Sequence, residues 1–289
     1  MPVAEKALVS WHGMQHQGAR DYQEDCWAAM LGDGLCDGLL LVVCDGMGGH
    51  AGGAVASRTA IQAFCQAFFQ DPPAEVTGRR LELALQAAQD AIGRQARLLP
   101  EYRTMGTTLV AAWIRPGWLN WVSVGDSLLV RVTPRGLERL NADHSMAPVL
   151  DDLVAAGRLS PAEAEADARR HALRSALGSE PPALVDSGEL RLSEGQPLTL
   201  LLASDGVQSL AEAELLALLN GPPAEAADVC RRLVEGVLDK RRPHQDNLTV
   251  LCYCVAGALP QALPGLLERV GDGLKRLWQR PGQPGKETV

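Results

Sequence analysis

The sequence predicts an α+β protein built from antiparallel β-sheets, with helices added outside them. Short apolar strand patterns separated by Gly and Asp turns dominate the 289-residue chain. Helical patterns come in pairs and do not alternate regularly with the strands. Because regular strand–helix–strand repeats are missing, a parallel sheet of the Rossmann type is disfavoured.

Strands are expected in the first half of the chain where short apolar runs are bounded by turn residues, namely at 7–11, 26–31, 39–44, 107–114, 118–124 and 128–133. Between them the apolar spacing becomes helical at residues 52–69 and 81–98.

The second half is predicted to begin with a helical segment, residues 146–176, that is polar on one face. Within it Ser160 and Glu163 have the spacing of a capping box, and Pro161 occupies the first helical position. The remaining elements are predicted strands at 185–192, 198–203 and 248–255 and predicted helices at 211–219 and 224–239.

The composition is that of a folded globular protein that does not bind nucleic acid. Hydrophobic residues make up 46% of the chain, which is enough for a sizeable core. The net charge is −8, whereas binding to nucleic acid depends on neutralising phosphates with Lys and Arg. The seven cysteines show no paired spacing and suggest reduced thiols. No signal-peptide pattern opens the chain and no apolar run approaches about 20 residues, so a soluble, cytoplasmic protein is expected.

Three aspartates lie next to apolar strand patterns. Asp45 and Asp205 come just after residues 39–44 and 198–203, and Asp246 precedes residues 248–255. A carboxylate at the end of a buried strand is costly to desolvate unless a positive charge meets it. Because no Lys or Arg lies within three residues of these aspartates, they predict a site for a divalent cation with oxygen ligands.

Seven motifs in order, over about residues 8–255, resemble the metal-dependent protein phosphatases of the type 2C family, and most closely their bacterial serine/threonine branch. The motifs are Gly18-Ala19-Arg20 with Glu24-Asp25, Val43-Cys44-Asp45-Gly46-Met47-Gly48-Gly49-His50, Gly106-Thr107-Thr108, Val124-Gly125-Asp126-Ser127, Asp143-His144-Ser145, Ser204-Asp205-Gly206-Val207 and Asp246-Asn247-Leu248-Thr249-Val250. The resemblance implies a central sandwich of two antiparallel β-sheets flanked by helices on both outer faces.

The resemblance also implies a centre of two Mn²⁺ or Mg²⁺ ions. Asp45 would bridge the ions, the backbone carbonyl of Gly46 would be a ligand, and Asp205 and Asp246 would complete the shell of the first ion. Asp126 would join Asp205 at a possible third ion.

Hydrolysis of phosphoserine and phosphothreonine in proteins is the activity implied, reversing a cellular kinase. Arg20 would grip the phosphate, and Glu24 and Asp25 would orient metal-bound waters. The alternative is a binding protein that has kept the fold and lost the metals; the presence of all three strand-end aspartates favours the enzyme. His144 is expected to hold a loop by hydrogen bonds.

One departure from the family pattern leaves the identity of the general acid open. Many relatives carry histidine directly after the Asp-Gly pair, where this chain has Met47. His50, a metal-bound water or no acid at all remain the alternatives.

Two domains are predicted, a catalytic domain at residues 1–256 and a C-terminal linker with an amphipathic helix at residues 257–289. The helix would either pack on the catalytic domain or dock on a partner or a membrane surface, because it is both basic and amphipathic. Bacterial relatives carry a flap beside the active site, and residues 146–170, called the flap here, are expected to play that part in a monomeric enzyme acting on phosphoproteins.

Overall fold

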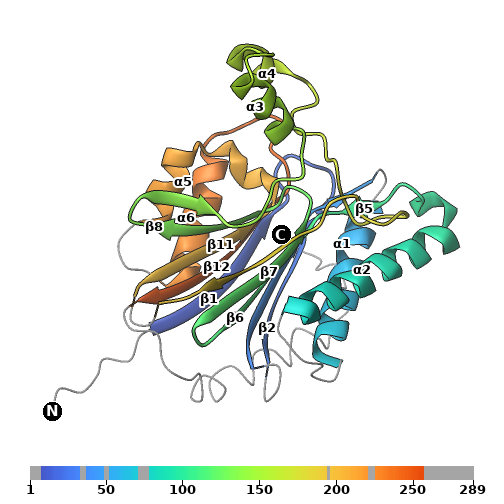
Figure 1. The fold of residues 1–289 in the computed structure, drawn as a ribbon, viewed down its shortest axis with the longest axis horizontal. Coiled ribbons are helices and arrows are strands. Elements are labelled where there is room, and N and C mark those ends of the chain that lie inside the picture. Colours follow the sequence, from blue (N-terminus) through green and yellow to red (C-terminus); the bar gives the residue numbers. More distant parts are fainter. Residues whose placement is uncertain are drawn as a thin grey trace, which may run out of the picture.

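The computed structural model describes residues 8–32, 37–48, 52–70, 78–193, 196–220 and 225–256. Its centre is formed by two five-stranded antiparallel sheets (Figure 1). The first sheet contains, in spatial order, β1 (Leu8–His16), β12 (Leu248–Ala256), β11 (Leu198–Ala203), β8 (Leu128–Thr133) and β9 (Gly136–Arg139). The second contains β10 (Asp186–Arg191), β7 (Trp118–Val124), β6 (Leu109–Arg115), β3 (Gly38–Cys44) and β2 (Cys26–Gly32).

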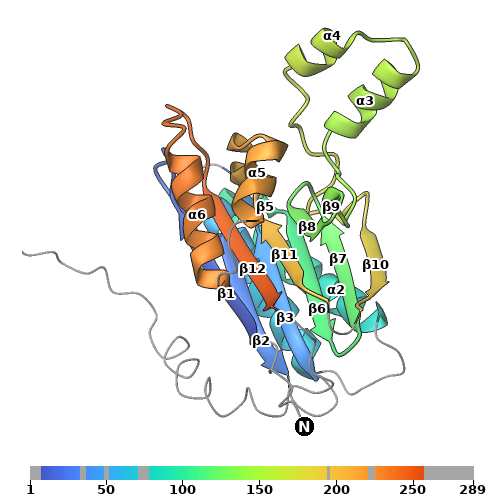
Figure 2. The same cartoon turned by 90° about the vertical axis from the view of Figure 1, so that its left-hand side faces the viewer.

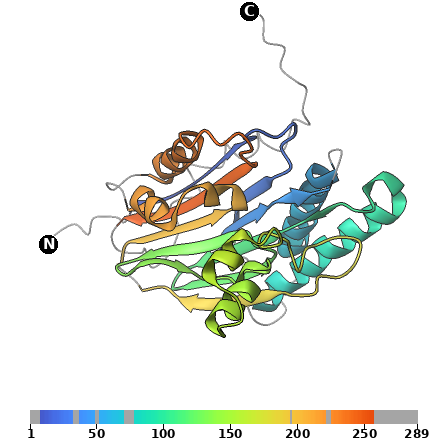
Figure 3. The same ribbon diagram turned by 90° about the horizontal axis from the view of Figure 1, so that it is seen from above.

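Helices cover the outer face of each sheet. The second sheet is covered by α1 (Gly52–Gln70) and α2 (Gly78–Leu98), and the first by α5 (Glu212–Leu219) and α6 (Ala226–Leu238). Figure 3 shows the two helix pairs on opposite sides of the sandwich. The predicted arrangement, helices on both outer faces of two antiparallel sheets, is therefore confirmed.

The core has three layers, because successive side chains of a strand point to opposite faces of its sheet. In β3 the side chains of Leu39 and Leu41 lie in the cluster between the two sheets, whereas those of Leu40 and Val42 lie in the cluster under α1 and α2. A strand that is buried on both faces becomes a continuous apolar run, as residues 39–44 are, and each buried leucine contributes about 1.5–3 kcal/mol.

The helices of the flap stand apart from these layers. They are α3 (Ala147–Ala155) and α4 (Pro161–Ala166), and in Figure 2 they extend beyond one end of the sheets. The capping box at the start of α4 is confirmed: the Glu163 N–H donates to Ser160 Oγ at 3.2 Å, and the Ser160 N–H donates to Glu163 Oε2 at 2.9 Å.

Several predicted boundaries were wrong. Residues 146–176 are not one helical segment, because α3 gives way to a turn in which Gly157 has φ +67° and residues 167–176 contain no helix. β1 is longer than predicted, since it pairs with β12 from Leu8 to His16. The short strand β9 was not predicted.

The predicted strand at 107–114 is divided in two. β5 (Gly106–Thr107) pairs with β4 (Gly46–Met47) in a separate small sheet, and β6 begins at Leu109. At the break, the backbone N–H of Thr108 donates to the carbonyl of Asp45 at 2.8 Å. The local apolar pattern cannot reveal this change of partner, because the paired residues, Gly46 with Thr107 and Met47 with Gly106, lie far apart in the sequence.

Short 3₁₀ helices at Pro100–Tyr102 and Asp205–Ser209 complete the elements described. Nowhere in the described ranges is a helix both long and apolar enough to cross a membrane. The predicted linker and helix of residues 257–289 lie outside the described residues, so the division into two domains stays a prediction.

Candidate metal centre

Strand ends from both sheets meet at one end of the sandwich and carry the predicted carboxylates. Asp45 follows Cys44, which pairs with Cys26 at the start of β2. Asp205 follows β11, whose last residue, Ala203, pairs with Val250 of β12. A cavity of about 370 Å³ opens at this end, and five carboxylates line it, from Glu24, Asp45, Asp126, Asp205 and Asp246. The structure therefore brings together residues that are up to 222 positions apart in the sequence (246 − 24).

The carboxylates of this pocket repel one another in a partly dehydrated environment. Asp45 is partly exposed to the pocket and surrounded by protein atoms on its other sides. This burial raises the pKa of Asp45 well above the usual range, and the charges of Asp25 and Asp205 raise it further. Burial and then the charge of Asp205 raise the pKa of Asp126 to about 7. Burial and the neighbouring Asp246 also raise the pKa of Asp205. Such a cluster is destabilised while its charges are unbalanced, and bound cations would relieve it.

The donor set suits a hard divalent cation. Carboxylate and carbonyl oxygens are the ligands that Mg²⁺ and Mn²⁺ prefer. Within the described ranges, no group of three or more acidic, histidine or cysteine side chains is arranged as a ready-made metal cage. The fit to a metal centre rests on the oxygen-rich lining and the excess negative charge, and the role of each ligand stays a prediction.

The backbone at Asp45 is fixed by two neighbouring threonines. The Asp45 N–H donates to Thr108 Oγ1 at 3.0 Å, and the Thr107 hydroxyl donates to the Asp45 carbonyl at 2.9 Å. The Thr108 hydroxyl in turn lies 2.7 Å from Ser127 Oγ. These contacts leave the carboxylate of Asp45 to face the pocket.

Gly46 occupies a position that no larger residue fits. A Cβ atom there would lie 2.2 Å from the carbonyl oxygen of Gly53 and 2.5 Å from that of Glu24. Both obstacles are backbone atoms, so the close approach of three chain segments requires glycine. Gly46 lines the pocket, as expected of a residue that would offer its carbonyl.

Arg20 lies at the mouth of the pocket, in the connection between β1 and β2. Its Nη2 is 2.6 Å from Asp246 Oδ2, and its side chain is 57% exposed. The loop is held in place because the Gln17 amide donates to the Arg20 carbonyl at 2.7 Å. Arg20 thus offsets part of the negative charge while its exposed guanidinium remains within reach of a ligand.

Glu24 and Asp25 occupy different positions although they are neighbours in sequence. Glu24 lines the pocket, and its Oε1 accepts a hydrogen bond from the Gly53 N–H at 3.2 Å. Asp25 is buried behind the pocket, where the Ser204 hydroxyl donates to its Oδ2 at 2.8 Å. Burial raises the pKa of Asp25 to about 6, and the hydroxyl of Ser204 opposes the shift.

Asn247 has a structural role that the sequence did not reveal. Its side-chain N–H groups donate to the carbonyls of Gln17 at 2.8 Å and Tyr22 at 2.9 Å, and its Oδ1 accepts from the Glu24 N–H at 2.8 Å. One buried amide thereby connects the loop of Arg20 to the start of β12. The position of Asn247 next to Asp246 could have indicated that it belongs to the site. Its three hydrogen-bond partners could not be predicted, because they are far away in the sequence.

Tyr22, His171 and Leu173 also line the pocket and were not predicted to do so. His171 and Leu173 come from the irregular segment after α4, where a helix was expected. Met47 lines the pocket as well, whereas His50 lies outside the described residues, so the general acid stays open.

His144 holds a loop by hydrogen bonds, as predicted. Its Nδ1 accepts from the Gly125 N–H at 3.2 Å, and its own backbone N–H donates to the Gly125 carbonyl at 3.1 Å. Burial lowers the pKa of His144, which favours the neutral ring whose Nδ1 can accept.

Comparison with known proteins identifies the family of this chain. The family model described as protein phosphatase 2C matches residues 12–249. Serine/threonine protein phosphatase PstP of Mycobacterium tuberculosis is 32% identical over 214 residues, which cover 73% of this chain and 39% of that protein. The chain thus spans about two fifths of the length of this relative. Serine/threonine phosphatase stp of Listeria monocytogenes is 31% identical over 221 residues, covering 73% of this chain and 82% of that protein.

A solved structure shows the same fold. The crystal structure of the catalytic domain of serine/threonine protein phosphatase PstP, in complex with two manganese ions, has a TM-score of 0.69 and 29% sequence identity, covering 87% of this chain and all (100%) of that one. The family match over residues 12–249, the relatives and the shared fold show that this chain belongs to the protein phosphatase 2C family.

Proposed function

We propose that this protein is a metal-dependent protein serine/threonine phosphatase. The observation that carries the proposal is the convergence of five carboxylates in one pocket, with the exposed Arg20 at its mouth. All the strand-end aspartates are present, which favours an enzyme over a binding protein that has lost its metals.

The ligands we propose are Asp45, the Gly46 carbonyl, Asp205 and Asp246, with Asp126 and Asp205 at a third, more weakly held ion. Divalent ions bound there would supply the Lewis acidity that makes water a nucleophile at neutral pH. Mn²⁺ and Mg²⁺ both suit the oxygen donors, and the relative whose structure contains two manganese ions supports the number two.

The protein's own side chains would bind and orient the substrate. Arg20 presents a planar guanidinium that matches two phosphoryl oxygens, a geometry that lysine cannot offer. Glu24, inside the pocket, would accept hydrogen bonds from water at the site, and Asp25, behind it, would keep the floor of the pocket in place. Phosphoserine and phosphothreonine proteins are the substrates proposed, as the names of the relatives suggest.

A cytoplasmic location is part of the proposal. The six cysteines in the described ranges are all free thiols. Several are buried together, with Cys230, Cys252 and Cys254 in the cluster under α5 and α6. Free thiols are typical of a reducing compartment.

The test is hydrolysis of a phosphothreonine peptide and of an aryl phosphate by the full chain, with Mn²⁺ and then with excess chelator. We expect activity on both substrates that the chelator removes and added Mn²⁺ restores. Activity that survives complete metal removal, or none at saturating Mn²⁺, would show that the proposal is wrong. The Asp205→Asn variant is the matched control for a contaminating phosphatase.

A further inference from the structure

The two ends of the flap return to the sandwich at one place, next to the turn that carries Asp126. Ser145 forms a β-bridge with Leu173, and the Met146 N–H donates to the Ala172 carbonyl at 2.9 Å. The Arg174 N–H donates to the carbonyl of His144 at 2.8 Å. Residues 143–145 and 172–174 are therefore the root from which α3 and α4 project (Figure 2).

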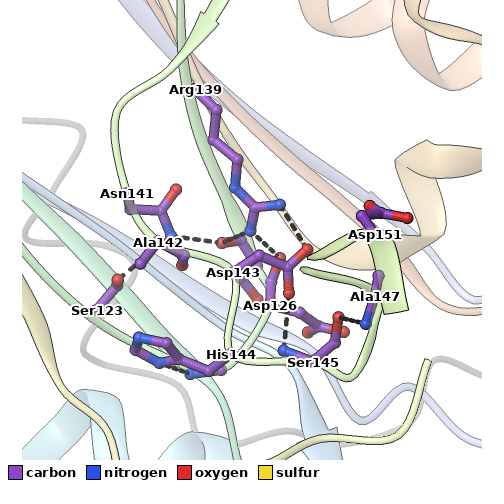
Figure 4. Close-up of polar contacts among 12 residues, drawn as sticks. Ser123, Asp126, Arg139, Asn141, Ala142, Asp143, His144, Ser145, Ala147 and Asp151 are labelled. Atoms are coloured by element: carbon purple, nitrogen blue, oxygen red, sulfur yellow. Dashed lines mark hydrogen bonds and ion pairs between the residues drawn. The ribbon is translucent and has the colours of Figure 1, made fainter. Parts of the chain in front are cut away.

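Arg139, the last residue of β9, contacts both the root and the Asp126 turn (Figure 4). Its Nη1 donates to Asp143 Oδ2 at 2.9 Å, and its Nη2 donates to the backbone carbonyl of Asp126 at 2.7 Å. A guanidinium can hold two acceptors at fixed positions because its donors form a rigid planar fork. Arg139 thus connects the root of the flap to the Asp126 turn.

Asp143 extends this connection into the flap. While one carboxylate oxygen accepts from Arg139, the other accepts from the Ser145 N–H at 2.8 Å. The hydroxyl of Ser145 then accepts from the N–H of Ala147, the first residue of α3, at 3.2 Å. Four consecutive contacts therefore lead from the Asp126 carbonyl to the first turn of a flap helix.

The Asp126 turn is also constrained from its other side. Gly125 has φ +99° and exchanges two hydrogen bonds with His144. A Cβ atom on Gly125 would lie 2.6 Å from the side chain of Thr108. Held in this way by its backbone, the turn directs the Asp126 carboxylate into the catalytic pocket, which Asp126 lines together with Asp205.

We infer that Arg139 and Asp143 are positioning residues that hold the Asp126 turn and the root of the flap as one unit. Neither residue is among the described residues that line the catalytic pocket. Besides the contacts they make, their charges act on the Asp126 carboxylate in opposite directions, since Asp143 raises its pKa and Arg139 lowers it. The carboxylate that we propose for the weakly held ion and the segment that we expect to meet protein substrates therefore move together. The inference rests on the proposed function for its kinetic and Mn²⁺-binding readouts, whereas hydrogen exchange tests it independently.

The test compares Arg139→Gln with Arg131→Gln in the full chain. Arg131 is a close control, because it lies in the same hairpin, its side chain is also 27% exposed, and it forms an ion pair with Glu138 at 2.6 Å. It lines a different groove, formed with β10 and β11, so it does not contact the pocket. Mn²⁺ binding is measured by calorimetry, and amide hydrogen exchange is followed at residues 125–127 and 145–147.

For Arg139→Gln we expect the affinity of the weakest Mn²⁺ site to fall about tenfold, as on losing a group that orients a ligand. Exchange should rise in both segments together. The kcat/KM for a phosphopeptide should fall more than that for an aryl phosphate. Arg131→Gln should match the wild type in all three measurements.

A second variant, Asp143→Asn, keeps the inference testable if Arg139→Gln does not fold. Asparagine retains one acceptor oxygen in place of two, so it cannot serve Arg139 and Ser145 on separate oxygens. We expect the same joint rise in exchange. Equal behaviour of the Arg139 and Arg131 variants, or increased exchange in one segment alone, would overturn the inference. If the wild type binds Mn²⁺ but hydrolyses neither substrate, the proposed function is wrong. Mn²⁺ binding and hydrogen exchange in the variants would still test the inference about Arg139 and Asp143.

Discussion

At the scale of single residues, the pocket is a group of carboxylates that repel one another, so holding them together lowers the stability of the folded protein. Asp45 and Asp205 both have raised pKa values, first because they are buried and then because other aspartates surround them. We predict that Asp45→Ala or Asp205→Ala abolishes hydrolysis and leaves the fold intact, since each change removes a proposed ligand and also relieves repulsion. The melting temperature of each metal-free variant should stay within about 2–4 °C of the wild type, or exceed it.

Activity with saturating Mn²⁺ and thermal unfolding with chelator are the two measurements. Wild-type turnover in either variant would contradict the assignment of that ligand. Unfolding of the variant at room temperature would instead show that the carboxylate supports the fold.

The second prediction at this scale concerns Arg20, which is exposed and paired with Asp246. Replacing it with alanine should mainly raise KM for a phosphopeptide, with a smaller loss in kcat, if it binds the ground and transition states alike. A charge-assisted hydrogen bond is worth about 1.5–3 kcal/mol, so kcat/KM should fall roughly 10- to 150-fold. Stability should change little because the pair lies at the surface.

Steady-state kinetics of Arg20→Ala and Arg20→Lys provide the check. Lysine should recover part of the loss, since it restores the charge without the planar fork. A KM equal to that of the wild type in the alanine variant would indicate that another residue holds the phosphate.

At the scale of elements, the flap helices bury few side chains against the rest of the described structure. Within α3 only Leu150 is buried, and within α4 only Ala164. Arg170 connects the two helices through ion pairs with Asp151 at 2.8 Å and Glu165 at 3.4 Å. Segments with few buried apolar contacts are the ones that open and close most readily.

We predict that shortening residues 153–166 changes the rates on phosphoproteins selectively. The catalytic pocket is lined by His171 and Leu173 from beyond this range, so small aryl phosphates should still reach it. The ratio of kcat/KM for a phosphoprotein to that for an aryl phosphate is the measurement. A uniform loss on both substrates would mean that the flap supports the fold of the pocket instead.

At the scale of the whole molecule, both faces of both sheets are covered by described residues. Three apolar clusters fill the space under α1 and α2, between the sheets, and under α5 and α6. Truncation after residue 257 removes no described member of these clusters. We therefore predict unchanged solubility, melting temperature and aryl phosphatase activity, an outcome that would support residues 258–289 as an appended docking element.

Thermal unfolding and aryl phosphate hydrolysis of the truncated and full chains decide this. Aggregation, or a large fall in melting temperature, would show that the tail packs on the catalytic domain. The amphipathic pattern of Leu263, Leu266, Leu267 and Val270 suits either outcome, which is why the comparison is informative.

The sequence by itself determined the kind and order of most elements, and it singled out aspartates that the structure brings into one pocket. Alternating and continuous apolar runs of 4–8 residues identified most of the strands, because side-chain direction has a period of two in a strand whatever its partners are. Asp45, Asp205 and Asp246 could be selected because a carboxylate beside a buried run needs a compensating charge, which is a local property.

Only the tertiary structure decided which of these residues face one another. The division at Thr108, the length of β1, the amide of Asn247, and the position of His171 all depend on partners distant in sequence. The same holds for Arg139, which has no motif of its own and acquires its role from the Asp126 carbonyl and the Asp143 carboxylate. Hydrogen bonds between segments are set by the packing of two sheets, and no pattern within one segment contains that information.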